Sequence, residues 1–149
     1  RYEESLIEYK ALAVEKPDLW QAKIEMARVM FWSGLKPDAV AVLEGIPPQY
    51  VDASGKLLMA ELYVALKSFD KAEAIYRAHL KARPQDYEVV VKLADLLSWS
   101  KRYDEAIAQY KTVLQATPDD VQLRRKYAYV LIWAGRNAEA AAELKKTLK

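Results

Sequence analysis

Apolar residues recur along most of the chain at steps of three and four, which is the spacing of one face of an α-helix. Between residues 89 and 97 they are Val89, Val90, Leu93, Ala94, Leu96 and Leu97. A stripe this wide is typical of a helix that buries much of its surface. Short polar breaks separate such segments, so the pattern predicts an all-α chain of paired amphipathic helices.

The pattern repeats along the chain. The segment Phe69-Asp70-Lys71-Ala72 has a counterpart 34 residues later in Tyr103-Asp104-Glu105-Ala106. A fixed period of this kind indicates stacked helical units. In this register residues 20–52, 53–86, 87–120 and 121–149 are repeats, and residues 1–19 are the second half of another. We therefore expect residues 1–149 to form a single array of about nine antiparallel helices.

Small side chains occupy one fixed position in each predicted helix of a pair. The first helices carry Ala27, Ala60, Ala94 and Ala128 there, and the second helices carry Ser5, Ala39, Ala72, Ala106 and Ala140. Small residues on facing helices let the two axes approach closely. Each pair should therefore form an antiparallel hairpin.

Turn and cap signals place the helix ends. Gly34 and Gly135 stand where first helices should stop in a left-handed residue, and Lys67 and Lys101 replace them in the middle repeats at some conformational cost. Asp18 with Gln21, and Asp119 with Gln122, have the spacing of capping boxes. The repeat 20–52 departs from this scheme, and we expect a longer connection over residues 45–54.

The third repeat resembles the tetratricopeptide repeat family at most of its signature places, although Val90 and Val113 stand where a Trp and a small residue are usual. The matching residues are Leu93-Ala94, Leu97, Tyr103, Ala106, Tyr110 and Pro118. The resemblance implies an α–α superhelix, that is, a tetratricopeptide solenoid. It also implies a non-enzymatic scaffold that binds a protein or peptide partner on the concave face of its first helices.

A second resemblance is carried by Trp32-Ser33-Gly34, Trp99-Ser100-Lys101 and Trp133-Ala134-Gly135. These segments are similar to repeats in periplasmic scaffolds of bacterial outer-membrane exopolysaccharide export proteins. The alternative function is therefore a segment that recruits a modifying enzyme or contacts glycan through a Trp ladder. This resemblance favours the bacterial periplasm over the cytoplasm, although the residues themselves leave the compartment open.

The resemblance to the repeat family places the candidate partner-binding residues on one face of the first helices. They are Arg28, Phe31, Trp32, Glu61, Asp95, Trp99, Arg125, Tyr129 and Trp133. The Lys, Arg and Asn clamp with which some family members hold a terminal carboxylate is absent. We expect Glu61 beside Asp95 to favour a basic or mixed-charge ligand.

Two interpretations of the three Trp residues remain. They either form an exposed ladder that contacts a ligand, or pack against the helix of the next repeat. Ala65, which takes the equivalent place in the second repeat, favours packing adapted to each site.

The composition of the chain limits the partners, cofactors and reactions that are expected for it. The net charge of +2 argues against a nucleic-acid partner, and no apolar run is long enough for membrane insertion. The chain has no Cys and no phosphate loop, zinc cluster or nucleophile elbow, so we expect no cofactor, no metal and no catalytic residue. The single His, His79, is expected to be a satisfied residue between repeats.

Arg1 enters in the middle of a repeat, and the last repeat is truncated. We expect a fragment of a larger array, whose open ends would favour end-to-end self-association.

Overall fold

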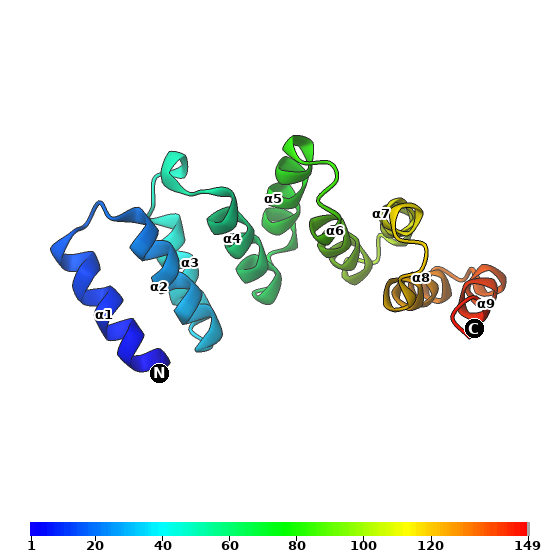
Figure 1. The fold of residues 1–149 in the computed structure, drawn as a ribbon, viewed down its shortest axis with the longest axis horizontal. Helices are drawn as coiled ribbons and strands as arrows, with labels where there is room; N and C mark the ends of the chain where they lie inside the picture. Colours follow the sequence, from blue (N-terminus) through cyan, green and yellow to red (C-terminus); the bar gives the residue numbers. More distant parts are fainter. Residues whose placement is uncertain (149) are drawn as a thin grey trace. The chain divides into compact units, whose positions relative to one another are not determined.

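A computed structural model describes residues 1–148. Over these residues the chain has nine α-helices, one short 3-10 helix and no strand, which confirms the predicted all-α chain (Figure 1). The α-helices are α1 (Tyr2–Glu15), α2 (Trp20–Trp32), α3 (Lys36–Glu44), α4 (Ala53–Ala65), α5 (Phe69–Ala82), α6 (Tyr87–Trp99), α7 (Tyr103–Ala116), α8 (Val121–Trp133) and α9 (Asn137–Lys145). The 3-10 helix η1 spans Pro48–Tyr50.

The helices fall into two compact units, Arg1–Ile75 and Tyr76–Lys149, and the boundary lies within α5. In unit 1, α1 packs on α2, α2 on α3, and α3 on α4. In unit 2, α6 packs on α7, α7 on α8, and α8 on α9 (Figure 1). The first helices of the repeats are α2, α4, α6 and α8, and each is joined to its second helix by a short turn.

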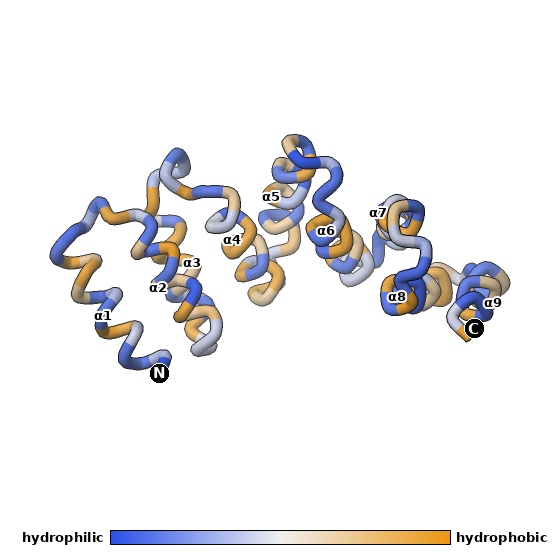
Figure 2. Tube along the Cα trace, viewed as in Figure 1, coloured by the Kyte–Doolittle hydropathy of each residue, from blue (hydrophilic) through white to orange (hydrophobic). Residues whose placement is uncertain are grey.

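Alanines sit where the helices of a pair meet. Ala27, Ala60, Ala94 and Ala128 have no exposed surface, and at the facing position of the second helices Ala39, Ala72, Ala106 and Ala140 are at most 1% exposed. The burial of these eight alanines agrees with the predicted close approach, and α2 packs on α3, α6 on α7, and α8 on α9. Apolar and polar residues alternate around this core along every helix (Figure 2).

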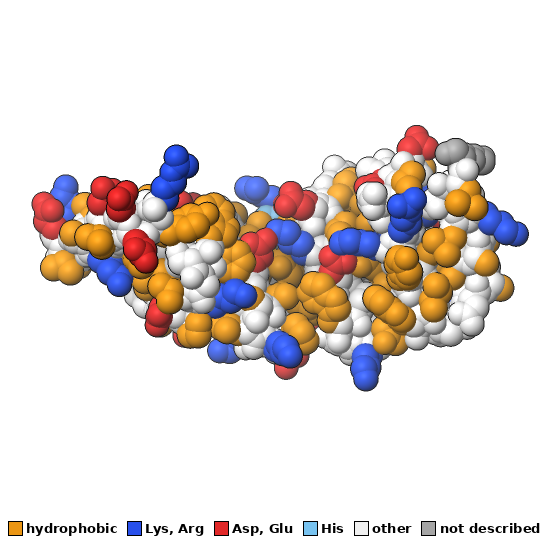
Figure 3. Space-filling model, turned by 90° about the horizontal axis from the view of Figure 1, so that it is seen from below, with side chains coloured by type: hydrophobic (Ala, Val, Ile, Leu, Met, Phe, Trp, Pro, Cys, Tyr) orange, Lys and Arg blue, Asp and Glu red, His pale blue; other side chains and the backbone are white. Residues whose placement is uncertain are grey.

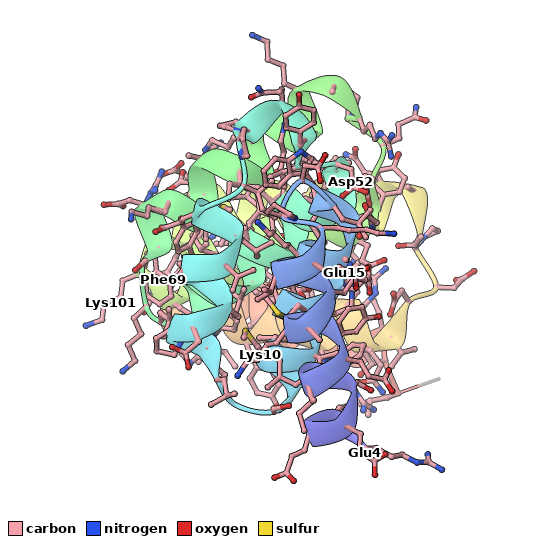
Figure 4. All side chains as sticks on the ribbon, turned by 90° about the vertical axis from the view of Figure 1, so that its left-hand side faces the viewer. Glu4, Lys10, Glu15, Asp52, Phe69 and Lys101 are labelled. Carbon is pink, nitrogen blue, oxygen red and sulfur yellow. The ribbon has the colours of Figure 1, made fainter. Side chains whose placement is uncertain are left out.

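Helix α1, with which unit 1 begins, differs from the other helices because it has no buried residue. Its Ile7 is 69% exposed and its Val14 is 84% exposed. Glu4, Lys10 and Glu15 mark its course in Figure 4 and are all exposed to solvent. Helix α1 therefore contributes little apolar burial to unit 1.

Left-handed residues end the first helices, as the sequence predicts. The φ angles are +83° at Gly34, +59° at Lys67, +60° at Lys101 and +77° at Gly135. The amide of the residue after each one donates back into the helix; for example, the Arg102 amide reaches the carbonyl of the residue at position 97 over 2.9 Å. This closure satisfies carbonyls at the helix end, and only the two lysines carry the steric cost of a side chain there.

The helix caps differ from the predicted capping boxes. The side chains of Asp52, Asp86 and Asp120 cap α4, α6 and α8 by accepting a backbone N–H three residues later. Figure 4 shows Asp52 where the chain enters α4. The capping boxes expected at Asp18 and Asp119 are wrong, because α2 begins after Leu19 without a side-chain cap and α8 begins after Asp120.

The longer connection expected over residues 45–54 is present between α3 and α4 and contains η1. Two features stabilise this connection. Ile46 and Val51 are buried, and the rings of Trp20 and Tyr50 stack with their centroids 5.5 Å apart. At Gly55 an added Cβ would lie 2.9 Å from the Val51 side chain. The irregular repeat is thus packed tightly against the start of α4.

His79 bridges the end of α5 to the start of α6. Its Nε2 lies 2.7 Å from the Asp86 carboxylate, and its side chain is 8% exposed. The hydrogen bond to His79 is the main cause that lowers the pKa of Asp86. The expectation of a satisfied structural histidine is confirmed.

Replacement of Gly135 by Ala should lower the free energy of unfolding by about 1 kcal/mol, because an L residue in the left-handed region carries a steric cost. Nothing lies within 4 Å of the added Cβ, so backbone strain alone is tested. Gly45→Ala is the control, since Gly45 has a φ of −77° and its new Cβ would make ordinary contacts. Urea unfolding should show loss in the first variant and none in the second; equal effects would contradict the assigned turn.

Replacement of Asp120 by Ala should cost about 1 kcal/mol of stability, because the amide of Leu123 loses its acceptor. Asp119→Ala removes the same charge one residue earlier and should change stability by less than about 0.5 kcal/mol. Thermal unfolding followed by circular dichroism compares the two variants. A larger loss for Asp119→Ala would restore the capping box predicted from the sequence.

Candidate functional site

Three tryptophans are open to solvent at the ends of first helices. Trp32, Trp99 and Trp133 are 59%, 56% and 55% exposed, and they are the last residues of α2, α6 and α8. Ala65, which ends α4, is exposed as well. The position therefore faces solvent at the end of all four first helices, and contact of the three indoles with a ligand stays a prediction.

In unit 2 two of these tryptophans border a pocket of about 190 Å³ between α6 and α8, to which α7 contributes one side chain. We call it the α6–α8 pocket. It is lined by Asp95, Ser98, Trp99, Tyr110, Lys126, Tyr129, Val130 and Trp133. Ser98, Tyr110 and Val130 are buried and form its floor, whereas Trp99, Tyr129, Trp133 and Lys126 are exposed and form its rim.

The Asp95 carboxylate joins three helices at this pocket. Its Oδ1 accepts a hydrogen bond from the phenol of Tyr110 on α7, and its Oδ2 accepts from Lys126 Nζ on α8 over 2.9 Å. The Ser98 hydroxyl donates to the carbonyl of Ala94 over 2.9 Å. Both polar side chains of the floor therefore have partners, which a buried hydroxyl or phenol requires.

The two hydrogen bonds of Asp95 differ in their surroundings. Burial, reinforced by the hydrogen bond to Asp95, raises the pKa of the Tyr110 phenol well above its ordinary value, so the phenol remains a donor at physiological pH. The Lys126 side chain is 51% exposed, against 20% for Asp95. Ion pairs this exposed contribute about 0.2–1 kcal/mol. Tyr110 is thus a fixed partner of Asp95, and Lys126 is a readily exchanged one.

The pocket brings together four of the candidate residues, namely Asp95, Trp99, Tyr129 and Trp133. Arg125 is exposed on α8 but does not line the pocket. Within the pocket Lys126 balances the charge of Asp95.

The remaining candidates, Arg28, Phe31, Trp32 and Glu61, lie on α2 and α4 of unit 1. Arg28 Nη2 donates to Ser54 Oγ over 3.0 Å and so links these two first helices. Phe31 and Glu61 are half-buried. Each unit therefore carries its own part of the predicted surface, and the pairing of Glu61 with Asp95 stays a prediction.

Sequence reasoning missed Lys126, which stands in a run of three basic residues. Arg124 pairs with Glu143 on α9 and also donates to the Pro118 carbonyl over 2.6 Å, Arg125 is exposed, and Lys126 pairs with Asp95. Successive helical residues point about 100° apart, so the three side chains of this run lie in three different environments. No signal in the run itself identifies the member that reaches a carboxylate 31 residues away.

Tyr110 and Val130 were also missed as pocket residues. Tyr110 is a signature residue of the third repeat, and its phenol reaches the pocket only because α7 packs under Asp95.

Within residues 1–148 no group of three or more His, Cys, Asp or Glu side chains is placed to hold a metal ion. No helix in this part of the chain has the length and apolar character needed to span a bilayer.

Comparison with known proteins identifies one family. The sequence model described as tetratricopeptide repeat matches residues 63–120 and 100–149, which together make up more than half of the chain. Comparison with curated protein sequences found no match.

Several solved structures share the fold. MamA from Desulfovibrio magneticus RS-1 has a TM-score of 0.88 at 15% identity, covering 99% of this chain and 84% of that protein. MamA MSR-1 has a TM-score of 0.86 at 21% identity, with 99% and 85% covered. A tetratricopeptide repeat protein from Parabacteroides merdae ATCC 43184 has a TM-score of 0.79 at 19% identity, with 97% and 57% covered. At these identities the likeness establishes the solenoid fold alone.

Replacement of Tyr110 by Phe should cost about 1.5 kcal/mol or more, because a hydrogen bond to a charged acceptor is lost inside unit 2. Tyr129→Phe removes the hydroxyl of an exposed ring in the same pocket and should change stability by less than about 0.5 kcal/mol. Urea unfolding measures both. Equal stability of the two variants would show that the Tyr110 phenol does not hold Asp95 in place.

Proposed function

The chain belongs to the tetratricopeptide repeat family, and we propose that this non-enzymatic protein-interaction scaffold binds a partner peptide or helix on the surface of its first helices. The observation that carries the proposal is the α6–α8 pocket, where Trp99, Tyr129 and Trp133 are each more than half exposed around a buried polar floor. Exposed aromatic side chains beside a pocket are the anchors that dominate binding energies.

The exposed area of the three aromatic rings of the rim limits the affinity for a partner. Aromatic side chains bury about 150–250 Å² when fully covered, so covering the exposed half of each ring removes about 100 Å² from water. At about 25 cal/mol per Å² this contributes about 2–3 kcal/mol per ring. Three rings together contribute about 6–9 kcal/mol, which exceeds the lower end of the association costs, about 4 kcal/mol, by about 2–5 kcal/mol. We therefore expect a dissociation constant near millimolar or weaker, unless contacts outside the pocket add to these rings.

The charge distribution supports a protein partner of mixed charge. Acidic and basic side chains are interspersed on the face drawn in Figure 3, without an area of one sign. Within the pocket, Asp95 and Lys126 balance each other. A polyanion such as nucleic acid requires clustered positive charge, which the pocket does not offer.

A second candidate is a periplasmic segment of an exopolysaccharide export system that recruits a modifying enzyme or contacts glycan. The exposed Trp99 and Trp133 favour it, since sugar rings stack on open indole faces, and the pair of Asp95 and Lys126 offers an acceptor and a donor to hydroxyl groups. The solved structures reported above carry other names, so the export context rests on the sequence resemblance alone.

Peptides selected from a random displayed library on the whole chain test the proposal. Their dissociation constants, measured by titration calorimetry, should rise about tenfold or more in a Trp99→Ala, Trp133→Ala double variant, because two aromatic contacts are lost. The matched control is Tyr2→Ala on α1, which removes a ring that is 50% exposed outside the pocket.

Circular dichroism should confirm that both variants fold. Selected peptides that bind the double variant and the original chain equally would refute the proposal. Cellohexaose or a mannuronate hexasaccharide that binds in a Trp-dependent manner, without any pocket-dependent peptide, would establish the glycan candidate in its place.

A further inference from the structure

We infer that the α6–α8 pocket selects an arginine side chain of the partner. In the unbound protein Lys126 pairs with Asp95, and the arginine replaces Lys126 in this ion pair when the partner binds. The inference rests on the proposed function, since it specifies what the pocket contacts in a bound peptide. It follows from three features of the pocket: exposed aromatic side chains, a half-buried carboxylate in its lining, and an exposed lysine paired with that carboxylate.

The aromatic side chains of the rim are each more than half exposed. Within residues 1–148 Trp99, Tyr129 and Trp133 make no ring-stacking or cation–π contact, whereas Trp20 is stacked on Tyr50. Rings that are neither stacked nor covered attract a cation to their faces, Trp most strongly. The rim is therefore suited to a flat, cationic group.

The Asp95 carboxylate in the pocket has one permanent and one exchangeable partner. Asp95 Oδ1 is held by the buried Tyr110 phenol, which keeps the carboxylate aimed into the pocket. Asp95 Oδ2 is held by the exposed Lys126 ammonium over 2.9 Å. Loss of such an exposed pair costs at most about a fivefold factor in an equilibrium, so an incoming cation can replace Lys126 at little expense.

Arginine fits the pocket better than other charged side chains. A carboxylate would approach Asp95 and meet repulsion, and a lysine would exchange one strongly hydrated ammonium for another with little gain. A guanidinium is planar and weakly hydrated, so it can stack on the rim while one N–H donates to Asp95 Oδ2. Lys126 then returns to solvent, and the charge balance at Asp95 is preserved.

The probe is acetyl-Gly-Arg-Gly-amide, compared with the same peptide containing citrulline, a neutral isostere of arginine. Binding to the whole chain is followed through the indole N–H signals of Trp99 and Trp133 in NMR spectra. We expect the arginine peptide to bind about fivefold or more tightly, because charged hydrogen bonds and cation–π contacts are lost with citrulline. Equal affinity of the two peptides would overturn the inference.

Two variants test the replacement of Lys126 by the arginine of the peptide, and they should change the affinity for the arginine peptide in opposite directions. Asp95→Asn keeps an acceptor for Tyr110 and should weaken binding of the arginine peptide about fivefold or more, with little effect on the citrulline peptide. Lys126→Met keeps the length of the side chain and should strengthen binding of the arginine peptide up to about fivefold, since Asp95 no longer has a competing cation. A general loss of structure cannot produce a gain, and weaker arginine binding by Lys126→Met would refute the exchange.

The experiments distinguish a failure of the arginine inference from a failure of the proposed function. If library-selected peptides depend on Trp99 and Trp133 but tolerate replacement of every arginine by citrulline, the arginine inference fails and the proposed function stands. If no selected peptide depends on these tryptophans, both fail. Dependence on both the tryptophans and arginine supports both.

Discussion

The structure depends on close contact between paired helices at alanine. Ala94 of α6 and Ala106 of α7, for example, are completely buried where the two helices meet. A larger side chain at either position would separate the helix axes or force its neighbours into strained rotamers. Within unit 2 the same contact recurs at Ala128 of α8 and Ala140 of α9, two helices that also pack on each other. The position of each first helix in this unit is therefore fixed by its contact with the second helix.

The chemistry of the pocket follows from satisfying a buried phenol. Tyr110 fills the space under α6 and is 2% exposed, so its hydroxyl needs an acceptor within unit 2. Asp95 supplies the acceptor and thereby becomes a carboxylate fixed in direction, with Lys126 as its second partner. A polar group that stabilises the fold is therefore also the polar group offered to a ligand. This coupling places the candidate site on rigid helices, where its geometry is well defined.

The exposed tryptophans have a comparable origin at the helix ends. Trp99 and Trp133 are the last residues of their helices, and the next turn contains a left-handed residue, Lys101 or Gly135. The chain turns away there, and each indole remains more than half exposed. Where the connection is irregular, as between α3 and α4, an aromatic pair instead forms within the chain, with Trp20 stacked on Tyr50. Local chain direction thus decides whether an aromatic ring packs on another ring or faces solvent.

The sequence by itself determined the features that are periodic or local: the helix pairs, the alanine contacts, and the left-handed turns at Lys67 and Lys101. Each of these depends on residue type within one turn or at one repeat interval. The tertiary structure decided which of two adjacent aspartates caps α8, and whether the tryptophans are covered. It also decided that Lys126 meets Asp95, because that contact depends on how α6, α7 and α8 pack and joins residues 31 positions apart. Such a contact carries no periodic or local signal, since it is set by backbone direction and by neighbours that only the packed helices bring together.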